Sequence, residues 1–431
     1  MKDLLIAGIV FASLPFIFKS PRVGVLMWVW ISVMNPHKLT YGFAYSFPFA
    51  AIIAGVTLVS LVASREQKSF PFNGVTVCML LFFLWMSITT LAAIYPESAY
   101  TIWEKVSKTF LFLFITLMVM RSKKDIELLV WLLAFSVGFF GIKGGIFTVM
   151  TGGQYKVWGP PGSYIEDNNA LALAVTMTIP LFNYLRGRVQ NKWLQRGFLA
   201  AMVLCGFAAL GTYSRGGLLA MAAMSLFLWT KSSRKLVFGS GMVLVGALLL
   251  AFMPDKWNDR MNTIQTYQED GSALGRLNAW QMAFNLANDR PIGGGFDIWT
   301  PELFYMYSPD PNRVHAAHSI YFAALGEHGY PGLLLYLAIF FLSWRTAARI
   351  VKQASRYREL EWVKQLAVAL QISMIGFAVG GAFLSLLYWD YQYYQFVLLV
   401  LLERYLQNWQ PGQADEPFFA KTKRPNVLHG R

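Results

Sequence analysis

Residues 314–332, VHAAHSIYFAALGEHGYPG, form the stretch at which a long polar segment re-enters an apolar run. The stretch holds three of the five histidines of the chain, and two of them, His315 and His318, lie at the boundary itself. A neutral imidazole there can take a proton from a hydroxyl on the aqueous side, while apolar neighbours hold an amphiphilic substrate. The simpler alternative is an interfacial histidine that only hydrogen-bonds a carbonyl. The charges and motifs around the stretch favour the first alternative.

The apolar run behind this boundary is one of many. Of the 431 residues, 56% are hydrophobic and 14% are charged, and the mean hydropathy is +0.43. These values are typical of an integral membrane protein. We predict an all-α, polytopic membrane protein with about 12 transmembrane helices, because each run approaches the length that crosses about 30 Å of hydrocarbon. The apolar runs cover residues 4–18, 22–34, 45–63, 74–95, 106–120, 126–148, 169–185, 194–211, 215–230, 235–253, 318–343, 362–382 and 386–403.

Several features refine this prediction. The first two runs are short, so they form either two thin spans or one broken element. The first run resembles a signal peptide but has no clear cleavage site, and we expect it to be retained. Cys78 and Cys205 lie far apart inside apolar runs, which predicts neither a disulfide nor a metal site. The spacing of Gly376 and Gly380 predicts a close approach between helices.

The basic residues set the predicted orientation. The formal net charge is +14, and many lysines and arginines fall in alternate short loops, as the positive-inside rule expects of cytoplasmic loops. This distribution argues against nucleic acid as a partner, since it forms no continuous basic face. We therefore predict membrane lipids as partners and a cytoplasmic tail at residues 406–431. The segments predicted to face outward are 35–44, 95–105, 149–168, 212–215 and 254–317.

The segment 254–317 is the longest predicted loop. It has roughly 60 residues, and loops of that length are usually functional. Leu277, Trp280 and Phe284 recur in it at helical spacing, which predicts an amphipathic helix over residues 276–288 on the membrane surface. The chain then divides into N-terminal transmembrane helices at 1–168, a core at 169–345 that includes this loop, C-terminal transmembrane helices at 346–405 and the tail.

Outward loops are usually poor in lysine and arginine, so an arginine in one of them suggests a function. Arg215 is the clearest case. It follows Ser214 and precedes Gly216 and Gly217, which let a ligand come close. An arginine that only snorkels from a helix end is the default explanation. With Arg276 in the neighbouring loop, however, two guanidinium groups can bind a diphosphate bidentately and stabilise a departing pyrophosphate.

The secondary candidates on the same predicted side are His315, Arg290, Arg313, Lys143 and Asp167. Lys143 lies inside an apolar run, where a charge needs a partner or a cavity. An ion pair with Asp167 or Glu166 is as good an interpretation of Lys143 as a ligand contact. Asp167 is a ready N-cap for the next helix, and it could also orient a histidine.

Several catalytic signatures are missing from the sequence. It contains no Walker motif, no dinucleotide fingerprint after a strand, no zinc-ligand spacing and no Gly-x-Ser-x-Gly elbow. The Asp-x-Asp motif that holds a metal in many nucleotide-sugar glycosyltransferases is absent as well. We therefore expect no cofactor and no catalytic metal.

Three motifs resemble the O-antigen ligase and polymerase superfamily in their order and spacing. They are Ser214-Arg215-Gly216, then Gly275-Arg276 followed by Trp280 and the turn from Pro291 to Gly295, then Ala317-His318-Ser319 followed by Glu327, Gly329 and Gly332. The match covers roughly residues 160–345. Residues 34–45 are similar to the branch described as exosortase-associated O-glycosylation ligases.

The resemblance implies a function and a set of site residues. Members of the superfamily are GT-C-like glycosyltransferases that work without a metal on a glycan carried by undecaprenyl pyrophosphate. The implied roles are a base-like His318 and donor pyrophosphate contacts from Arg215 and Arg276. The family's usual dipeptide is His-Asn, whereas this chain has His318-Ser319. His315 competes with His318 for the catalytic role, because two residues three positions apart on a helix would share a face. The implied protein is an inverting O-antigen ligase of the bacterial inner membrane, active at the periplasmic face, with the lipid A-core of lipopolysaccharide as acceptor.

Three alternatives stay open from the sequence. A polymerase that extends a glycan and an O-oligosaccharyltransferase that modifies a protein would use the same donor. A polysaccharide transporter would also have about a dozen spans. Charges along a central path would favour the transporter, whereas the candidate charges in this chain gather at one predicted face.

Overall fold

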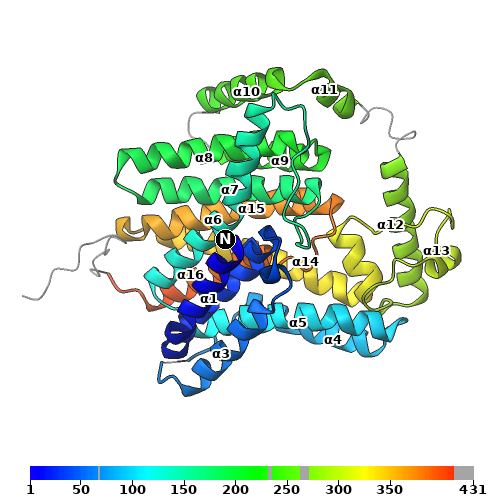
Figure 1. Cartoon of the computed structure of the whole chain (residues 1–431), viewed down its shortest axis with the longest axis horizontal. Coiled ribbons are helices and arrows are strands. Elements are labelled where there is room, and N and C mark those ends of the chain that lie inside the picture. The colour runs from blue at the N-terminus through cyan, green and yellow to red at the C-terminus, as the bar shows by residue number, and fades with distance from the viewer. Residues whose placement is uncertain (67, 232–234, 263–270, 412–431) are drawn as a thin grey trace, which may run out of the picture.

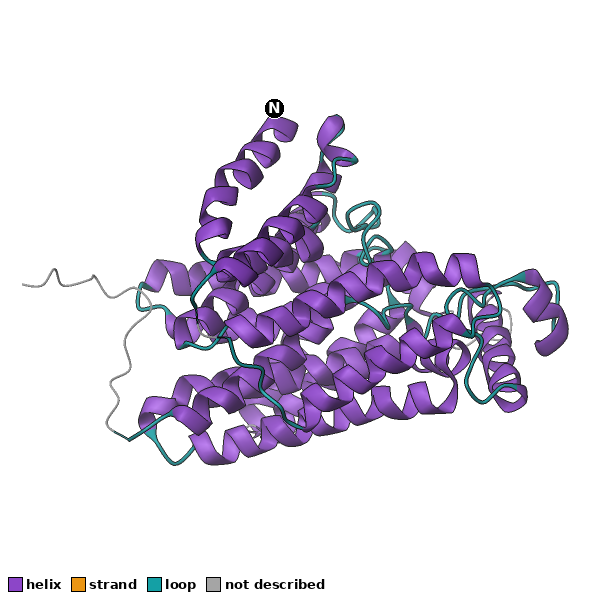
Figure 2. Ribbon diagram, turned by 90° about the horizontal axis from the view of Figure 1, so that it is seen from below, coloured by secondary structure: helices purple, strands orange, loops and turns teal. Residues whose placement is uncertain are grey.

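The computed structural model describes residues 1–66, 68–231, 235–262 and 271–411. Within these ranges every regular element is a helix, which confirms the predicted all-α class, and the helices form the bundle shown in Figures 1 and 2. In chain order they are α1 (Lys2–Lys19), α2 (Pro21–Val29), η1 (Trp30–Met34), η2 (Pro36–Leu39), η3 (Phe43–Tyr45), α3 (Phe49–Ala63), α4 (Gly74–Leu91), α5 (Pro96–Val119), α6 (Lys123–Met150), α7 (Asn168–Arg188), α8 (Lys192–Gly211), α9 (Arg215–Lys231), α10 (Lys235–Phe252), α11 (Asp255–Asn262), α12 (Gly271–Asp289), α13 (Pro301–Tyr307), α14 (Ile320–Ala354), η4 (Arg358–Leu360), α15 (Glu361–Gly380), η5 (Gly381–Phe383) and α16 (Asp390–Asn408).

The apolar runs of the sequence become helices. Each predicted run overlaps one of them, and the first two runs form separate helices because Ser20 between α1 and α2 has an extended backbone. By length and composition, six described helices can cross a membrane: α4, α6, α8, α10, α14 and the segment Arg358–Phe383 around α15. Shorter apolar helices lie at Pro21–Met34, Phe49–Ala63 and Arg215–Thr230. The chain is therefore a multi-pass membrane protein, while the count of about 12 spans and the GT-C-like architecture stay predictions.

The core of the bundle is built around α7, α15 and α16. Helix α7 is buried on nearly all sides, since its sequence carries small and apolar residues around the whole helix. It pairs with its neighbours through a few internal polar contacts, such as the 2.9 Å between the hydroxyls of Thr178 and Tyr391. The predicted close approach at Gly376 and Gly380 is confirmed, because a Cβ at Gly380 would lie 2.7 Å from Leu173 of α7.

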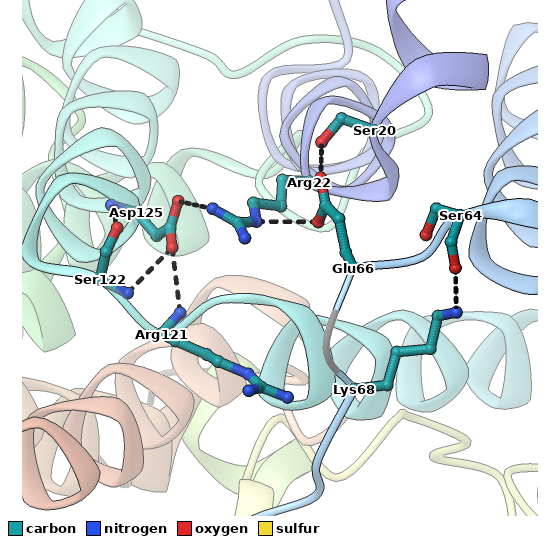
Figure 3. Close-up of polar contacts among 8 residues, drawn as sticks. All are labelled: Ser20, Arg22, Ser64, Glu66, Lys68, Arg121, Ser122 and Asp125. Atoms are coloured by element: carbon teal, nitrogen blue, oxygen red, sulfur yellow. Dashed lines mark hydrogen bonds and ion pairs between the residues drawn. The ribbon is translucent and has the colours of Figure 1, made fainter. Parts of the chain in front are cut away.

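One end of the bundle carries ion pairs that tie basic loops to buried carboxylates. Arg22 donates from Nε to Glu66 at 3.0 Å and lies 3.7 Å from Asp125 through Nη1 (Figure 3). Arg188, at the end of α7, pairs with Glu127 of α6 at 3.0 Å. Glu66, Asp125 and Arg188 lie in or next to three loops predicted to be cytoplasmic from their basic residues, which are Arg65 and Lys68, Arg121 to Lys124, and Arg186 to Arg196. The contacts bring these loops together at the same end.

The long segment 254–317 contains helices of its own. The predicted helix at 276–288 lies inside α12, which runs beside α13 at the right of Figure 1. Leu277 and Phe284, on the predicted apolar face, are 47% and 43% exposed, and the contact of this face with the membrane stays a prediction. The buried face carries Met282 and Leu286 instead, since α12 packs laterally against α13 and α14 with that face.

The stretch around the two histidines also differs from its prediction. Residues 313–319 are not helical, and α14 begins at Ile320 rather than at 318. His315 and His318 therefore do not share a helix face. The backbone of His318 is left-handed, with φ 43°, so the segment turns sharply where a helix would continue. Helix α14 is itself broken at Gly329, with φ 66°, two residues before Pro331.

Candidate functional site

A cavity of about 330 Å³ opens at the end of the bundle opposite to the ion pairs of Arg22 and Arg188. Asn169 at the start of α7 lines the cavity, whereas Arg188 is at the end of the same helix. Three arginines line it, and together they define what we name the arginine cavity: Arg215, Arg260 and Arg276. The first turn of α12 contributes Ser272 and Ala273 to the same wall. The remaining lining residues are Asn169, Tyr213, Gly216, Leu219, Phe383 and Leu384.

The turn between α8 and α9 places Arg215 at the cavity. Tyr213 has a left-handed backbone, with φ 60°, and its hydroxyl donates to the carbonyl of Gly153 at 2.7 Å. Oγ of Ser214 accepts from the amide of Gly217 at 3.0 Å and so caps the start of α9. A Cβ at Gly217 would lie 2.5 Å from Cβ of Ala172, so glycine lets α9 start against α7. Arg215 consequently lies at a helix N-terminus, where amides and the helix dipole favour an anion.

Helix α12 carries Arg276 and holds the histidine segment. A Cβ at Gly275 would lie 2.7 Å from Cδ2 of His315, so the absent side chain makes room for that ring. Trp280 donates from Nε1 to the carbonyl of Ala317 at 2.7 Å, and its ring stacks on Phe322 with centroids 4.9 Å apart. Residues on both sides of Arg276, Gly275 and Trp280, thus contact the segment that leads to His318.

Arg260 is a residue that sequence reasoning missed. It lies in α11, one turn after Trp257, whose Nε1 donates to the carbonyl of Leu210 at 3.1 Å. Trp257 is buried with Tyr213 and Met253 in a small apolar cluster. The signal in the sequence was weak, since Arg260 is one of several charges in a long loop and no motif around it distinguishes it from the others.

His318 lies beside the arginine cavity in a constrained position. Its Nδ1 is 3.3 Å from Oγ of Ser385, and the ring is partly buried. Burial lowers the pKa of His318, the positive charges of Arg276 and His315 lower it further, and the Asp167 carboxylate opposes them. The imidazole is therefore neutral near neutral pH and able to accept a proton.

The residues after His318 fix the start of α14. Ser319 is buried and caps the helix, with Oγ 3.5 Å from the amide of Phe322. Serine and asparagine are both strong N-caps, so the change from His-Asn to His318-Ser319 keeps this role. The hydroxyl of Tyr321 donates to the carbonyl of Ala378 at 2.8 Å and joins α14 to α15.

The glycine-rich motifs attach the long loop to α14. The amides of Gly294 and Gly295 donate to the carbonyls of Gly326 and Glu327 at 2.9 and 2.8 Å. A Cβ at Gly329 would lie 1.9 Å from the carbonyl oxygen of Pro291, so only glycine fits there. Buried Glu327 accepts from Nε1 of Trp299 at 3.0 Å and from the hydroxyl of Tyr388. None of these described residues lines the arginine cavity, so their part is to position the loop.

The other predicted site residues occupy different places. Arg313 lies 3.6 Å from Asp310 in an exposed pair, and Arg290 donates to the carbonyl of Ala92 at the end of α4. Asp167 caps α7 as predicted, accepting from the amide of Asn169 at 2.8 Å. Lys143 lines a different cavity, and within the described residues it forms no ion pair with Asp167 or Glu166.

This arrangement has a definite chemical capacity. Guanidinium groups and helix amides can hold the oxygens of a phosphate or diphosphate, and a neutral imidazole beside them can accept a proton from a hydroxyl. Among the described residues, no three His, Cys, Asp or Glu side chains are grouped closely enough to hold a metal ion. The structure brings Arg215 and Arg276 to one cavity with His318 near Arg276, and leaves Arg290, Arg313 and Lys143 outside it.

Comparison with protein families divides the chain in two. Residues 200–337, from α8 to α14, match the O-antigen ligase family, and residues 1–190 match a family of unknown function (DUF5935). No curated protein matches the chain. The first match contains all three arginines of the arginine cavity and His318.

Proposed function

We propose, from the premise that this chain belongs to the O-antigen ligase superfamily, that it transfers a glycan from undecaprenyl pyrophosphate to a sugar hydroxyl of the lipid A-core. The observation that supports the proposal is the arginine cavity, in which Arg215 and Arg276 converge next to His318. The family supports a ligase or polymerase type of glycosyl transfer. The donor, the acceptor and the residue roles are our proposal.

In the proposed reaction, the guanidinium groups bind the pyrophosphate of the donor. The step requires the tautomer in which Nδ1 of His318 donates to Oγ of Ser385, 3.3 Å away, and Nε2 accepts the proton of the acceptor hydroxyl. The hydroxyl oxygen attacks the anomeric carbon, and the bond from that carbon to the pyrophosphate oxygen breaks. One direct displacement inverts the anomeric configuration. The negative charge that develops on the leaving group is stabilised by Arg215, Arg276 and Arg260 together.

The cellular setting of the proposal follows from the charged loops. We place the protein in the bacterial inner membrane with the ion-paired end in the cytoplasm, as the positive-inside rule indicates. The arginine cavity then faces the periplasm. Residues 169–345 form the ligase core, between N-terminal helices at 1–168 and C-terminal helices at 346–405. The predicted cytoplasmic tail, 406–431, lies almost wholly outside the described residues.

The test uses the purified full-length chain with an undecaprenyl-pyrophosphate-linked glycan and rough lipopolysaccharide, without added metal. We expect transfer by the wild-type protein and a loss of roughly 10²–10⁴-fold in His318→Ala, the usual contribution of a general base. Arg313→Ala is the matched control, because its side chain is exposed and paired with Asp310. A folded His318→Ala protein with full activity would remove His318 from the mechanism.

Parallel reactions separate the acceptor classes. The same donor is offered with a protein acceptor or with a second lipid-linked glycan in place of lipopolysaccharide. Transfer to either of these, but not to lipopolysaccharide, would contradict the lipid A-core acceptor and retain the glycosyl-transfer chemistry.

A further inference from the structure

A cavity larger than the arginine cavity lies away from it. It measures about 1040 Å³ and is bounded by α1, η1, η2, α6 and residues 156–161. Four lysines line it, and they define what we name the lysine groove: Lys2, Lys38, Lys143 and Lys156. Of the described residues that line the groove, none is acidic, so its local charge favours an anion.

Local contacts account for the shape of the groove. The ammonium of Lys38 lies 4.1 Å from the ring centroid of Tyr45 and donates to the Tyr45 carbonyl at 3.1 Å. At the rim, the Asp3 carboxylate accepts from the amide of Ala44 at 3.1 Å and holds the start of α1 against the turn at Gly42. The side chains of Lys143 and Lys156 are exposed. The groove therefore has one fixed lysine, and Lys143 and Lys156 are accessible to a ligand.

A second cavity continues from the groove along α6. It measures about 590 Å³, shares Trp30, Met34, Phe139 and Lys143 with the groove, and is otherwise lined almost entirely by apolar side chains. We name it the apolar slot; its further lining residues are Leu132, Phe135, Ser136, Ile142 and Ile146. Because Phe135 and Ile146 are exposed on the surface of a candidate membrane helix, the slot opens towards the bilayer.

The depth of Lys143 in the membrane follows from helix geometry. With about 1.5 Å of rise per residue, Lys143 lies about 30 Å along α6 from Lys123, which is the thickness of the hydrocarbon region. If the basic end of α6 is at one membrane surface, Lys143 is at the level of the opposite headgroups. The slot residues Leu132, Phe135 and Phe139 precede it and lie at the level of the hydrocarbon. This holds for either orientation of the chain.

We propose that the lysine groove and the apolar slot together bind an anionic glycerophospholipid of the surrounding bilayer. The lysines bind its phosphate, since ammonium groups are strong point-charge donors to phosphate oxygens. An acyl chain lies in the slot along α6. A slot of this volume is in the range that encloses a drug-sized molecule, which suits one or two acyl chains rather than a long polyprenyl tail or the many chains of a lipid A.

The bound lipid has a structural connection to the arginine cavity. Residues 156–161 form a wall of the groove, and the amide of Val157 in this wall donates to the carbonyl of Gly211 at 2.9 Å. The carbonyl of Gly153, just before it, accepts from the hydroxyl of Tyr213 at 2.7 Å. The lipid therefore braces the loop that supports the turn before Arg215.

The experiment measures lipid retention by the full-length protein. The chain is reconstituted in phosphatidylcholine nanodiscs with graded phosphatidylglycerol, extracted in mild detergent and weighed by native mass spectrometry. We expect wild type to retain phosphatidylglycerol in preference to phosphatidylcholine, and Lys143→Gln/Lys156→Gln to weaken this retention roughly tenfold or more. Lys192→Gln/Lys352→Gln is the matched control, because both lysines are exposed and neither lines the groove.

A separate variant tests the slot. Ile146→Trp fills the slot at its exposed edge and leaves all four lysines in place, so we expect it to lose phosphatidylglycerol as well. Equal retention of the two phospholipids by wild type would overturn the proposal. So would an undiminished preference for phosphatidylglycerol in both the lysine variant and Ile146→Trp. A second set of nanodiscs also contains undecaprenyl phosphate. A preference for that lipid which the lysine variant abolishes would overturn the proposal too, because the groove would then belong to the donor. No glycan donor or acceptor is present, so the result is independent of the proposed glycosyl transfer.

Discussion

The two ends of the bundle use arginine in opposite ways. At one end two arginines meet carboxylates from other segments of the chain: Arg22 meets Glu66 and Asp125 (Figure 3). Arg188 meets Glu127. At the other end Arg215, Arg260 and Arg276 line one cavity and face the same space. Three positively charged side chains around one cavity give it a positive potential, which favours an anion. The identity of a residue is the same at both ends, and the difference lies in what the fold brings beside it.

In this comparison of the two ends, we expect the largest effect when one arginine is removed from the arginine cavity. Arg276→Ala should reduce kcat/KM for glycosyl transfer by roughly 10²–10³-fold, the usual cost of losing one group that stabilises developing negative charge. We expect the variant to remain folded, so that activity falls more than thermal stability. Steady-state kinetics with the lipid-linked donor check this, with Arg313→Ala as control. Loss of folding in place of activity would assign Arg276 a structural role.

The matched experiment at the ion-paired end of the bundle should lower stability and leave activity unchanged. Arg188→Ala leaves Glu127, whose side chain is 3% exposed, without this partner. Removing one member of a buried ion pair costs about 3–5 kcal/mol, so the variant should unfold at clearly lower temperature or denaturant. Its kcat/KM should match wild type under conditions in which it is folded. A thermal shift measured in detergent decides this, and unchanged stability would contradict the structural role of the pair.

A smaller effect is expected at the link between α12 and the histidine segment. Trp280→Phe keeps an aromatic ring against Phe322 but removes the hydrogen bond to the carbonyl of Ala317. A neutral hydrogen bond contributes about 1 kcal/mol, so stability should fall by this amount and kcat several-fold, as His318 loses its fixed position. Rate and melting curves of the same preparation measure both. A fall in stability with unchanged kcat would show that this bond does not position His318.

The smallest effect is a displacement of the pH profile. The pKa of His318 is lowered by burial and then by Arg276, so the imidazole is neutral above that pKa and transfer should be lost as pH falls below it. In Arg276→Gln the second cause disappears, the pKa rises towards its ordinary value, and the acid limb should move to higher pH. The profile of kcat/KM against pH, measured for both proteins, tests this. An acid limb that does not move would indicate that another group controls it.

The sequence predicted the helices well and the contacts between them poorly. The apolar runs correspond to helices because burial of apolar side chains in hydrocarbon requires only local composition and length. The face of α12 that packs within the protein, with Met282 and Leu286, was not predicted, since α13 and α14 decide which face is covered. The shared helix face of His315 and His318 was wrong for a similar reason: contacts of Trp280 and Ser319 hold that segment in a turn.

The site residues divide in the same way, into those that a sequence motif marks and those that only the fold brings to the site. Arg215 and Arg276 could be singled out because motifs surround them, whereas Arg260 has no local signal and reaches the cavity through the packing of Trp257 against Leu210. Lys143 was recognised as a charge in an apolar run, but its neighbours Lys2, Lys38 and Lys156 come from three other segments of the chain. A cavity assembled from distant segments leaves no regular spacing in the sequence.

By itself, the sequence determined that this protein is helical and multi-pass, which segments are apolar and which arginines and histidine carry a family motif. These properties depend on composition, length and local spacing. Only the tertiary structure decided which charges meet a carboxylate and which line a cavity, and it alone revealed the lysine groove beside its apolar slot. The physical reason is that electrostatic and packing interactions act between atoms a few ångströms apart, and segments that lie far apart in the sequence supply those atoms.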